Sequence, residues 1–425
     1  MSDITRIDLW QVLDSRGVPT VAARVHVGTH NAVAIAPSGA STGRHEALFL
    51  RDGKTSYNGL SVTDAIAKFT KEVTPALIGM ASNDFFELDK VLRSFDPTVT
   101  QSRYGGHIPV AISIATWLAH AKRANLQPFD VIAQHVGCKP TIPMPMVNIF
   151  SGGAHAGRAI DLQDILAIPT RATSFPEALE WIWQIRESAK SLLQKRGIDT
   201  SLVADEGGLT GRLASDEEAI ALVTEAIDDA KLSGKAHIAL DIAATQLFDG
   251  KKYAIHENGL TVTLDSPAFI SRWQGWLDKY PIISVEDGAA EDDQVGWQLQ
   301  SALTSRIQVL GDDRYATQLH RLNSGIEQSE ANAILIKPNQ GGSLYAALST
   351  LKRAKQSAWR TVVSARSGDT EESWLADLAT GSSAGQIKVG STHRSERTAK
   401  WNRLLELSYD RAAPFNAEGT LNAFI

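Results

Sequence analysis

Three carboxylates stand where short apolar runs end, at Asp241, Glu286 and Asp312. The runs before them, such as Ile282-Ile283-Ser284-Val285, have the composition of buried strands. If these strands are neighbours, the carboxylates meet at one rim, and hard oxygen donors suit Mg²⁺ better than Zn²⁺. Each acid alone could instead stand near the N-terminus of the next helix, where the helix dipole favours it. We predict a Mg²⁺ site formed by all three.

Lys337 ends a similar run, Ala333-Ile334-Leu335-Ile336, and is expected at the same rim. Burial and nearby cations both disfavour a protonated lysine, so we expect a lowered pKa and a role as a general base. The alternative is a salt bridge between Lys337 and a carboxylate of a neighbouring strand.

A glycine-rich segment, Pro37-Ser38-Gly39-Ala40-Ser41-Thr42-Gly43, carries small hydroxylated residues and has nothing to bury. Such a cluster is commonly a flexible surface loop. It could also be a mobile lid whose hydroxyls and main-chain groups close over an ion.

The elements that must position these residues follow a regular pattern after residue 140. Apolar runs end at charged residues spaced by 22 to 45 residues, about the length of one strand and its returning helix. The ends are Val203-Ala204-Asp205-Glu206, Asp241, Glu286, Asp312, Lys337, Arg366 and Lys388. Ser174 and Ser215 are expected to cap helices between such runs. The spacing favours a parallel (β/α)8-type barrel, and the alternative is a doubly wound open sheet, although no dinucleotide or Walker loop follows a strand.

The first part of the chain has a different pattern. Alternating apolar residues from Ile7 to Val27, interrupted by a turn-rich stretch, predict a strand meander. Helical spacing follows over Val62 to Val73 and Ile108 to Ala119. We therefore predict an α/β protein with a smaller N-terminal α+β domain at residues 1–136 and a catalytic barrel at residues 137–425.

Composition limits the function further. The chain has 425 residues, 43% of them hydrophobic and 21% charged, which excludes disorder as the dominant state. A net charge of −6 gives no basic field for a nucleic acid or an anionic membrane. One cysteine, Cys138, excludes an intrachain disulfide and favours a reducing compartment. With no bilayer-length apolar run and a polar start unlike a secretory signal, we expect a cytoplasmic protein.

Short distinctive segments follow one another along the chain. They are Val12-Leu13-Asp14-Ser15-Arg16-Gly17, Pro19-Thr20, Pro37 to Gly43 with His45-Glu46-Ala47, Gly152-Gly153-Ala154-His155-Ala156-Gly157, Asp205-Glu206-Gly207-Gly208, Gly311-Asp312-Asp313, Lys337-Pro338-Asn339-Gln340, Arg366-Ser367-Gly368-Asp369-Thr370-Glu371, Gly385-Gln386-Ile387-Lys388 and Arg394-Ser395-Glu396-Arg397. In this order, over essentially the full length, the chain resembles the enolase family.

The resemblance implies a capping domain on a barrel, a homodimer or a multiple of dimers, and Mg²⁺-dependent dehydration of a small anionic phosphorylated hydroxy acid. By position, Lys337 corresponds to the family's base and Glu206 to the acid that protonates the departing hydroxyl. The ligands of the first Mg²⁺ correspond to the three carboxylates named above. Ser41 corresponds to the residue that helps hold a second Mg²⁺ with the substrate phosphate.

The resemblance also implies the substrate contacts. Lys388 and Gln163 correspond to residues that contact the substrate carboxylate and hydroxyl. His155 corresponds to a loop residue near the phosphate, and Arg366 with Ser367 to the phosphate cradle.

Departures from the family fall in the same regions. The family's Ser-His-Arg-Ser-Gly is Ser364-Ala365-Arg366-Ser367-Gly368 here, so a methyl group replaces an imidazole. Arg158 stands where the family has Asn, and Asp164 where it has Glu. Gly288 and Gln246 stand where the family commonly has Pro and Glu. The added space and charge favour a substrate with a larger or additional anionic group, and we count Arg158 and Asp164 among the residues near it.

The function predicted is an enolase-type lyase that converts 2-phosphoglycerate to phosphoenolpyruvate or acts on a close analogue. One alternative is a dehydratase similar to carboxyphosphonoenolpyruvate synthases in a phosphonate pathway. Another is a catalytically impaired paralogue with a binding or structural role, although the base, the acid and the metal ligands are all retained. A racemase or cycloisomerase is disfavoured by the lid and the phosphate cradle.

Overall fold

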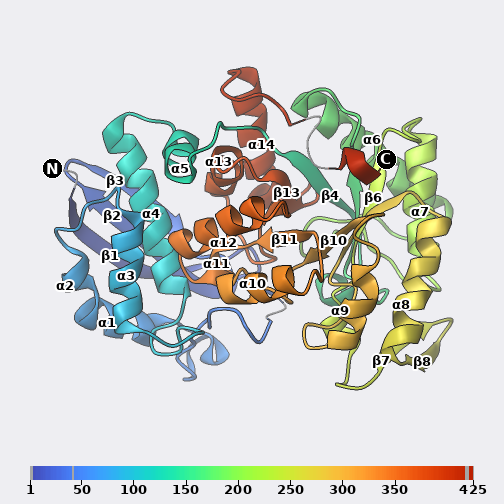
Figure 1. Ribbon diagram of the computed structural model, residues 1–425, viewed down its shortest axis with the longest axis horizontal. Coiled ribbons are helices and arrows are strands. Elements are labelled where there is room, and N and C mark those ends of the chain that lie inside the picture. The colour runs from blue at the N-terminus through green and yellow to red at the C-terminus, as the bar shows by residue number, and fades with distance from the viewer. Residues whose placement is uncertain (1–2, 41–42, 417–420, 425) are drawn as a thin grey trace.

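The computed structural model describes residues 3–40, 43–416 and 421–424. It consists of an N-terminal sheet with its helices, blue to cyan at the left of Figure 1, and a larger barrel surrounded by helices. The predicted α/β fold class, with a barrel and a smaller α+β unit, is confirmed.

The N-terminal unit is built on an antiparallel meander. Strands β1 (Ile4–Leu13), β2 (Pro19–Val27) and β3 (His30–Ile35) pair in chain order, as the alternating apolar residues predicted. Helix α4 (His107–Ala124) packs against β2 and β3. The other helices of this unit are η1 (Ser56–Gly59), α1 (Thr63–Glu72), α2 (Thr74–Leu77), α3 (Phe85–Phe95) and α5 (Pro128–Val136).

The larger unit is a closed eight-stranded barrel in which strands adjacent in the chain are neighbours in the wall. Its strands are β4 (Met144–Ser151), β5 (Asp164–Ile168), β6 (His237–Asp241), β9 (Ile282–Glu286), β10 (Gln308–Gly311), β11 (Ala333–Ile336), β12 (Arg360–Ser364) and β13 (Gly385–Gly390). A separate hairpin, β7 (Tyr253–Glu257) and β8 (Leu260–Leu264), lies between β6 and β9 in sequence.

The structure corrects two details of the predicted barrel. Strand β5 runs antiparallel to both β4 and β6, so the array is not wholly parallel. Residues 203–206 form a loop that ends in a turn rather than a strand. A search for apolar runs that end in a charge misses β5, because its reversed direction places the charged Asp164 at the start of the run.

The barrel is covered by helices whose starts the sequence partly predicted. Ser174 Oγ accepts a hydrogen bond from Glu177 N (3.3 Å) at the start of α6, and Ser215 Oγ accepts one from Glu218 N (3.2 Å) at the start of α7. The helices are α6 (Phe175–Lys195), α7 (Asp216–Asp229), α8 (Ser266–Gln274), α9 (Gln294–Ser301), α10 (Leu319–Glu327), α11 (Pro338–Gly341), α12 (Leu344–Gln356), α13 (Trp374–Gly381) and α14 (Ser395–Tyr409), with short turns η2 (Gly153–Ala156), η3 (Ala244–Leu247), η4 (Gly275–Asp278) and η5 (Asn422–Phe424).

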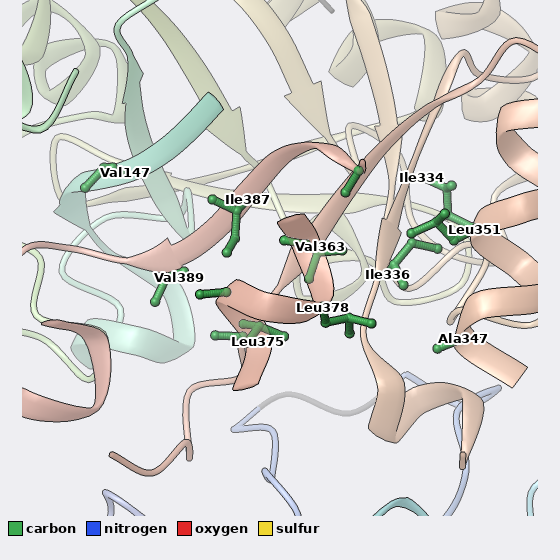
Figure 2. Packing of buried hydrophobic residues seen from close by; sticks show 14 of the residues in the cluster. Val147, Ile334, Ile336, Ala347, Leu351, Val363, Leu375, Leu378, Ile387 and Val389 are labelled. Carbon is green, nitrogen blue, oxygen red and sulfur yellow. The ribbon is translucent and has the colours of Figure 1, made fainter. Parts of the chain in front are cut away.

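Successive residues of each barrel strand face opposite sides of the wall. Leu335 of β11 belongs to a buried cluster that also includes Met146, Leu166 and Leu310 from other strands. Its neighbours Ile334 and Ile336 pack outward against α12, as Figure 2 shows. Because both faces of each strand are buried, the strands are nearly continuous apolar runs.

The N-terminal unit is fastened to the barrel beside the strand ends. Ser38 and Gly368 exchange two backbone hydrogen bonds of 2.8 Å. Arg16 donates to Ser38 Oγ (2.9 Å) and to the backbone oxygen of Gly39 (3.1 Å), which fixes the start of the glycine-rich segment. None of the helices in the described part of the chain combines the length and apolarity needed to cross a bilayer.

Candidate active site

A cavity of about 20 Å³ lies at the rim formed by the ends of the barrel strands, with space for roughly one water molecule. We call it the catalytic cavity. Its lining residues come from distant parts of the sequence: Gly39, His155, Gln163, Glu206, Asp241, Lys337, Ser364, Ala365, Arg366, Ser367 and Lys388. The structure therefore brings together the base, the acid and most of the substrate contacts expected from the sequence.

Two lysines pair with the three carboxylates of the predicted metal site. Lys388 Nζ donates to Asp241 Oδ2 and to Glu286 Oε2, each at 2.7 Å. Lys337 Nζ donates to Asp312 Oδ2 at 2.5 Å. The salt bridge considered as an alternative for Lys337 is thus present.

The pKa of Lys337 differs from the sequence prediction. Burial acts to lower the pKa of this ammonium, but Asp312 and Glu286 raise it, and the net shift is upward. The prediction of a lowered pKa was wrong, because the partner carboxylate outweighs desolvation. The ion pair with Asp312 therefore stabilises the protonated form of Lys337.

The carboxylates fit a hard cation in their chemistry. Glu286 is fully buried, yet its Oε1 has no hydrogen-bond partner in the described part of the chain. Burial and the neighbouring Asp241 raise its pKa well above the usual value, although Lys388 acts to lower it. An all-oxygen donor set with an orphaned oxygen suits Mg²⁺.

In the described part of the chain, Asp241, Glu286 and Asp312 do not form one group whose oxygens all lie within 4.8 Å of one another. Among the described residues, the acidic group whose oxygens lie within 4.8 Å of one another is Asp287, Asp312 and Asp313. Asp287 accepts hydrogen bonds from the backbone nitrogens of Asp312 (2.9 Å) and Asp313 (2.8 Å), so it fixes the turn after β10. Asp241 and Glu286 are instead held by Lys388. Ser41, expected at a second Mg²⁺, lies outside the described residues.

His155 lies between two carboxylates. Its Nδ1 is 2.9 Å from Asp164 Oδ2, and its Nε2 is 3.8 Å from Glu206 Oε1. Burial acts to lower the pKa of His155, but Asp164 and Glu206 raise it to about 9. Burial acts to raise the pKa of Glu206, whereas His155 and Arg397 lower it, and the net shift is downward. His155 is therefore protonated at neutral pH, while burial raises the pKa of Asp164 even though the imidazolium acts to lower it.

This arrangement predicts a pH-dependent stability. The pKa of His155 is about 9 in the folded protein and 6.5 in the unfolded chain. The contribution of protonated His155 to the free energy of unfolding is therefore fully present below pH 6.5 and is lost as pH rises through 9. The difference corresponds to roughly 3 kcal/mol. Urea unfolding at pH 6 and pH 9.5 should show that the wild-type protein loses more stability than His155→Gln. Parallel losses in both proteins would contradict the assignment.

Asp164 and Gln163 reach the rim from the start of β5. Asp164 is fully buried behind His155 and does not line the cavity; it accepts hydrogen bonds from Asn148 and from Ser151 Oγ (2.9 Å). Gln163 Nε2 donates to Asp241 Oδ2 (3.2 Å), and its Oε1 accepts from Gln246 Nε2 (2.8 Å). Gln246, a departure from the family, thus orients the Gln163 amide.

The Arg366–Ser367 segment is anchored by residues that the sequence reasoning did not assign. Arg366 Nη1 donates to Glu46 Oε2 (2.7 Å), and Ser367 Oγ accepts from the backbone nitrogen of Ala40 (2.6 Å). Arg397, fully buried, donates to the backbone oxygens of both Arg366 (2.7 Å) and Ser367 (2.5 Å). Glu46 and Arg397 both belong to segments that carried the family resemblance, which was the available signal.

Arg158 lies elsewhere. It is exposed, has a left-handed backbone (φ 58°) and lines a separate cavity of about 370 Å³ together with Arg212 and His256. The structure does not bring Arg158 into the catalytic cavity, although His155 is only three residues away.

Comparison with protein-family models agrees with this geometry. Residues 4–132 match the model described as the enolase N-terminal domain. Residues 139–420 match the model described as the enolase C-terminal TIM barrel domain. Together these matches account for the meander, the barrel and the rim on which the charged residues gather, and the chain belongs to the enolase family.

Proposed function

We propose that this protein is a Mg²⁺-dependent hydro-lyase that removes the proton α to a carboxylate and eliminates a β-hydroxyl as water. The proposed reaction is 2-phosphoglycerate to phosphoenolpyruvate, or the same step on a close analogue. The observation that carries this proposal is that Lys337 and Glu206 line one small buried cavity with Lys388 and Arg366. The proposed base, the proposed proton donor and two cations therefore face the space that the reacting part of an anionic substrate would occupy.

Lys337 is proposed to take the α-proton in its neutral form. Its ion pair with Asp312 stabilises the charged form, so loosening that pair is part of activation. Asp241, Glu286 and Asp312 would hold Mg²⁺, which would supply positive charge where negative charge develops. Lys388, freed from its two carboxylates, would then contact the substrate carboxylate.

Glu206 is proposed to deliver a proton to the departing hydroxyl. Since its pKa is lowered, it first has to be protonated, and the imidazolium of His155 is the adjacent donor. Asp164 keeps that ring in place through Nδ1. Gln163 would contact the hydroxyl, and Arg366 with Ser367 would hold the phosphate.

The second candidate is a dehydratase similar to carboxyphosphonoenolpyruvate synthases. Ala365 favours it, because this residue lines the catalytic cavity with a methyl group where the family has an imidazole. A substrate with an additional anionic group could use the space.

We further propose that the protein acts in the cytoplasm as a homodimer. Light scattering of the purified protein would test the dimer.

Ala365→His tests the ordinary reaction against the altered one. If the imidazole is the missing part, kcat/KM for 2-phosphoglycerate should rise at least about tenfold, equivalent to roughly 1.4 kcal/mol of transition-state stabilisation. If the shorter Asp164 has also altered the pocket, Ala365→His with Asp164→Glu will be needed. Arg158→Asn is the matched control and should change little, because Arg158 is outside the cavity. Wild-type turnover equal to that of an ordinary enolase would contradict an altered substrate.

A further inference from the structure

Gln246 lies on a turn that the surrounding chain holds in place. The turn, η3, follows strand β6 and begins at Ala244, whose nitrogen donates a hydrogen bond to the backbone oxygen of Asp287 (3.2 Å). The next residue, Thr245, accepts a hydrogen bond at Oγ1 from the backbone nitrogen of Glu291 (2.8 Å). The side chain of Gln246 therefore extends from a fixed point.

Hydrogen bonds connect Gln246 to the charged pair at the end of β6. Gln246 Nε2 donates to Gln163 Oε1 (2.8 Å), and Gln163 Nε2 donates to Asp241 Oδ2 (3.2 Å). The same oxygen of Asp241 accepts from Lys388 Nζ (2.7 Å). A carboxylate paired with an ammonium only accepts hydrogen bonds, so Gln163 must turn its nitrogen toward Asp241 and its oxygen toward residue 246. Residue 246 must therefore be a donor.

This orientation leaves Gln163 with a hydrogen to donate. Its side-chain nitrogen carries two hydrogens, and Asp241 accepts one of them. No other side chain or backbone oxygen in the described part of the chain accepts the second. Gln163 is 7% exposed and lines the catalytic cavity together with Glu206 and Lys388. Because buried polar groups normally have partners, this hydrogen suits an oxygen of the bound substrate.

A glutamate at position 246, the residue common in the family, would not support this orientation. An ionised carboxylate has the shape of the glutamine amide but no hydrogen to donate. The oxygen of Gln163 would then lie against the oxygens of residue 246, or, if the amide turned over, against those of Asp241. Each arrangement places acceptors together without a hydrogen between them, which is unfavourable in a buried site. The residue at position 246 therefore decides whether Gln163 is held as a donor.

We propose that Gln246 is a positioning residue that makes Gln163 a hydrogen-bond donor to the substrate. The inference rests on the proposed function, and the acceptor is then the oxygen of the departing hydroxyl. Negative charge develops on this oxygen as its bond to carbon breaks, and the N–H of Gln163 stabilises that charge. The proton from Glu206 then completes the water molecule. Gln246 thus acts on the elimination step and not on removal of the α-proton.

Two substitutions at position 246 separate polarity from shape. Gln246→Glu keeps the shape and removes the donor, whereas Gln246→Met has a similar length and carries neither an N–H nor a charge. Proton NMR of 2-phosphoglycerate in D₂O measures α-hydrogen exchange and phosphoenolpyruvate formation in the same sample. Phosphoenolpyruvate formation should fall at least about tenfold in Gln246→Glu and less in Gln246→Met. Exchange should stay within about twofold of the wild-type rate in both.

A variant of Gln163 tests whether the effect passes through its amide. Gln163→Leu removes the amide, so adding Gln246→Glu to it should cause little further loss of phosphoenolpyruvate formation. The matched control is Gln184→Glu on helix α6, which changes an amide bonded to Glu180 and should leave both reactions unchanged.

Three results would overturn the role of Gln246. The first is an equal loss from Gln246→Glu with and without the Gln163 amide, because the added charge would then act directly. The second is Gln246→Glu performing no worse than Gln246→Met, because shape alone would then matter. The third is a loss of exchange as large as the loss of elimination. If the wild-type protein shows neither reaction, the proposed function fails and this inference fails with it.

Discussion

Replacing Lys337 by alanine is expected to abolish exchange of the substrate α-hydrogen with deuterated solvent, by roughly 10³-fold or more. The reason is that Lys337 is the proposed base in the catalytic cavity. Proton NMR of 2-phosphoglycerate in D₂O measures the exchange directly. Glu206→Gln should stop elimination and yet leave exchange measurable, since it removes only the proposed proton donor.

Lys337→Arg separates the base from the ion pair. Arginine can keep the bridge to Asp312 but is not deprotonated in proteins, so exchange should be lost while the melting temperature is retained. Lys337→Ala loses both, because Asp312 is left buried without its partner. Wild-type exchange in the arginine variant would remove Lys337 from its proposed role.

Asp312→Ala is expected to weaken Mg²⁺ binding by about 100-fold or more, measured by calorimetry without substrate. The variant removes one oxygen ligand and also leaves Lys337 without its carboxylate, and an unpaired ammonium repels a cation. The same variant should lose turnover. The control is Glu217→Gln, which also removes one carboxylate from an ion pair, here with Lys279. Because Glu217 lies on α7 and away from the rim, this variant should bind Mg²⁺ normally. Equal Mg²⁺ affinity in Asp312→Ala and wild type would refute the proposed metal site.

The positions of the rim residues could be predicted because a buried strand is a local pattern. An apolar run such as the one before Glu286 or Lys337 stops where a charged residue cannot be enclosed by the barrel wall, and this is visible in the sequence. The direction of β5 was not predictable in this way. A run of five residues carries no mark of strand polarity, and pairing with β4 and β6 decides it.

The charge state of the site depends on contacts between side chains that come from different strands of the barrel. The sequence placed Lys337 and Asp312 at one rim, but not within 2.5 Å of each other, and this distance reverses the pKa shift of the lysine. Arg158 shows the same limit. It was counted among the residues near the substrate because it departs from the family in a region of substrate contacts, whereas the structure places it at a different cavity.

The reversed strand β5 has a consequence for how such a protein can diversify. Residues 152–163 leave the wall at Ser151 and return to it at Asp164, and these two residues are paired in register. Gly152 N also donates to Gln163 O at 3.0 Å, which closes the base of the loop. The loop that carries His155 therefore begins and ends at paired residues of two adjacent strands, and it contains none of the helices that surround the barrel. Recombination between relatives could exchange it as a unit, changing the chemistry at the rim while the barrel and its helices keep their packing.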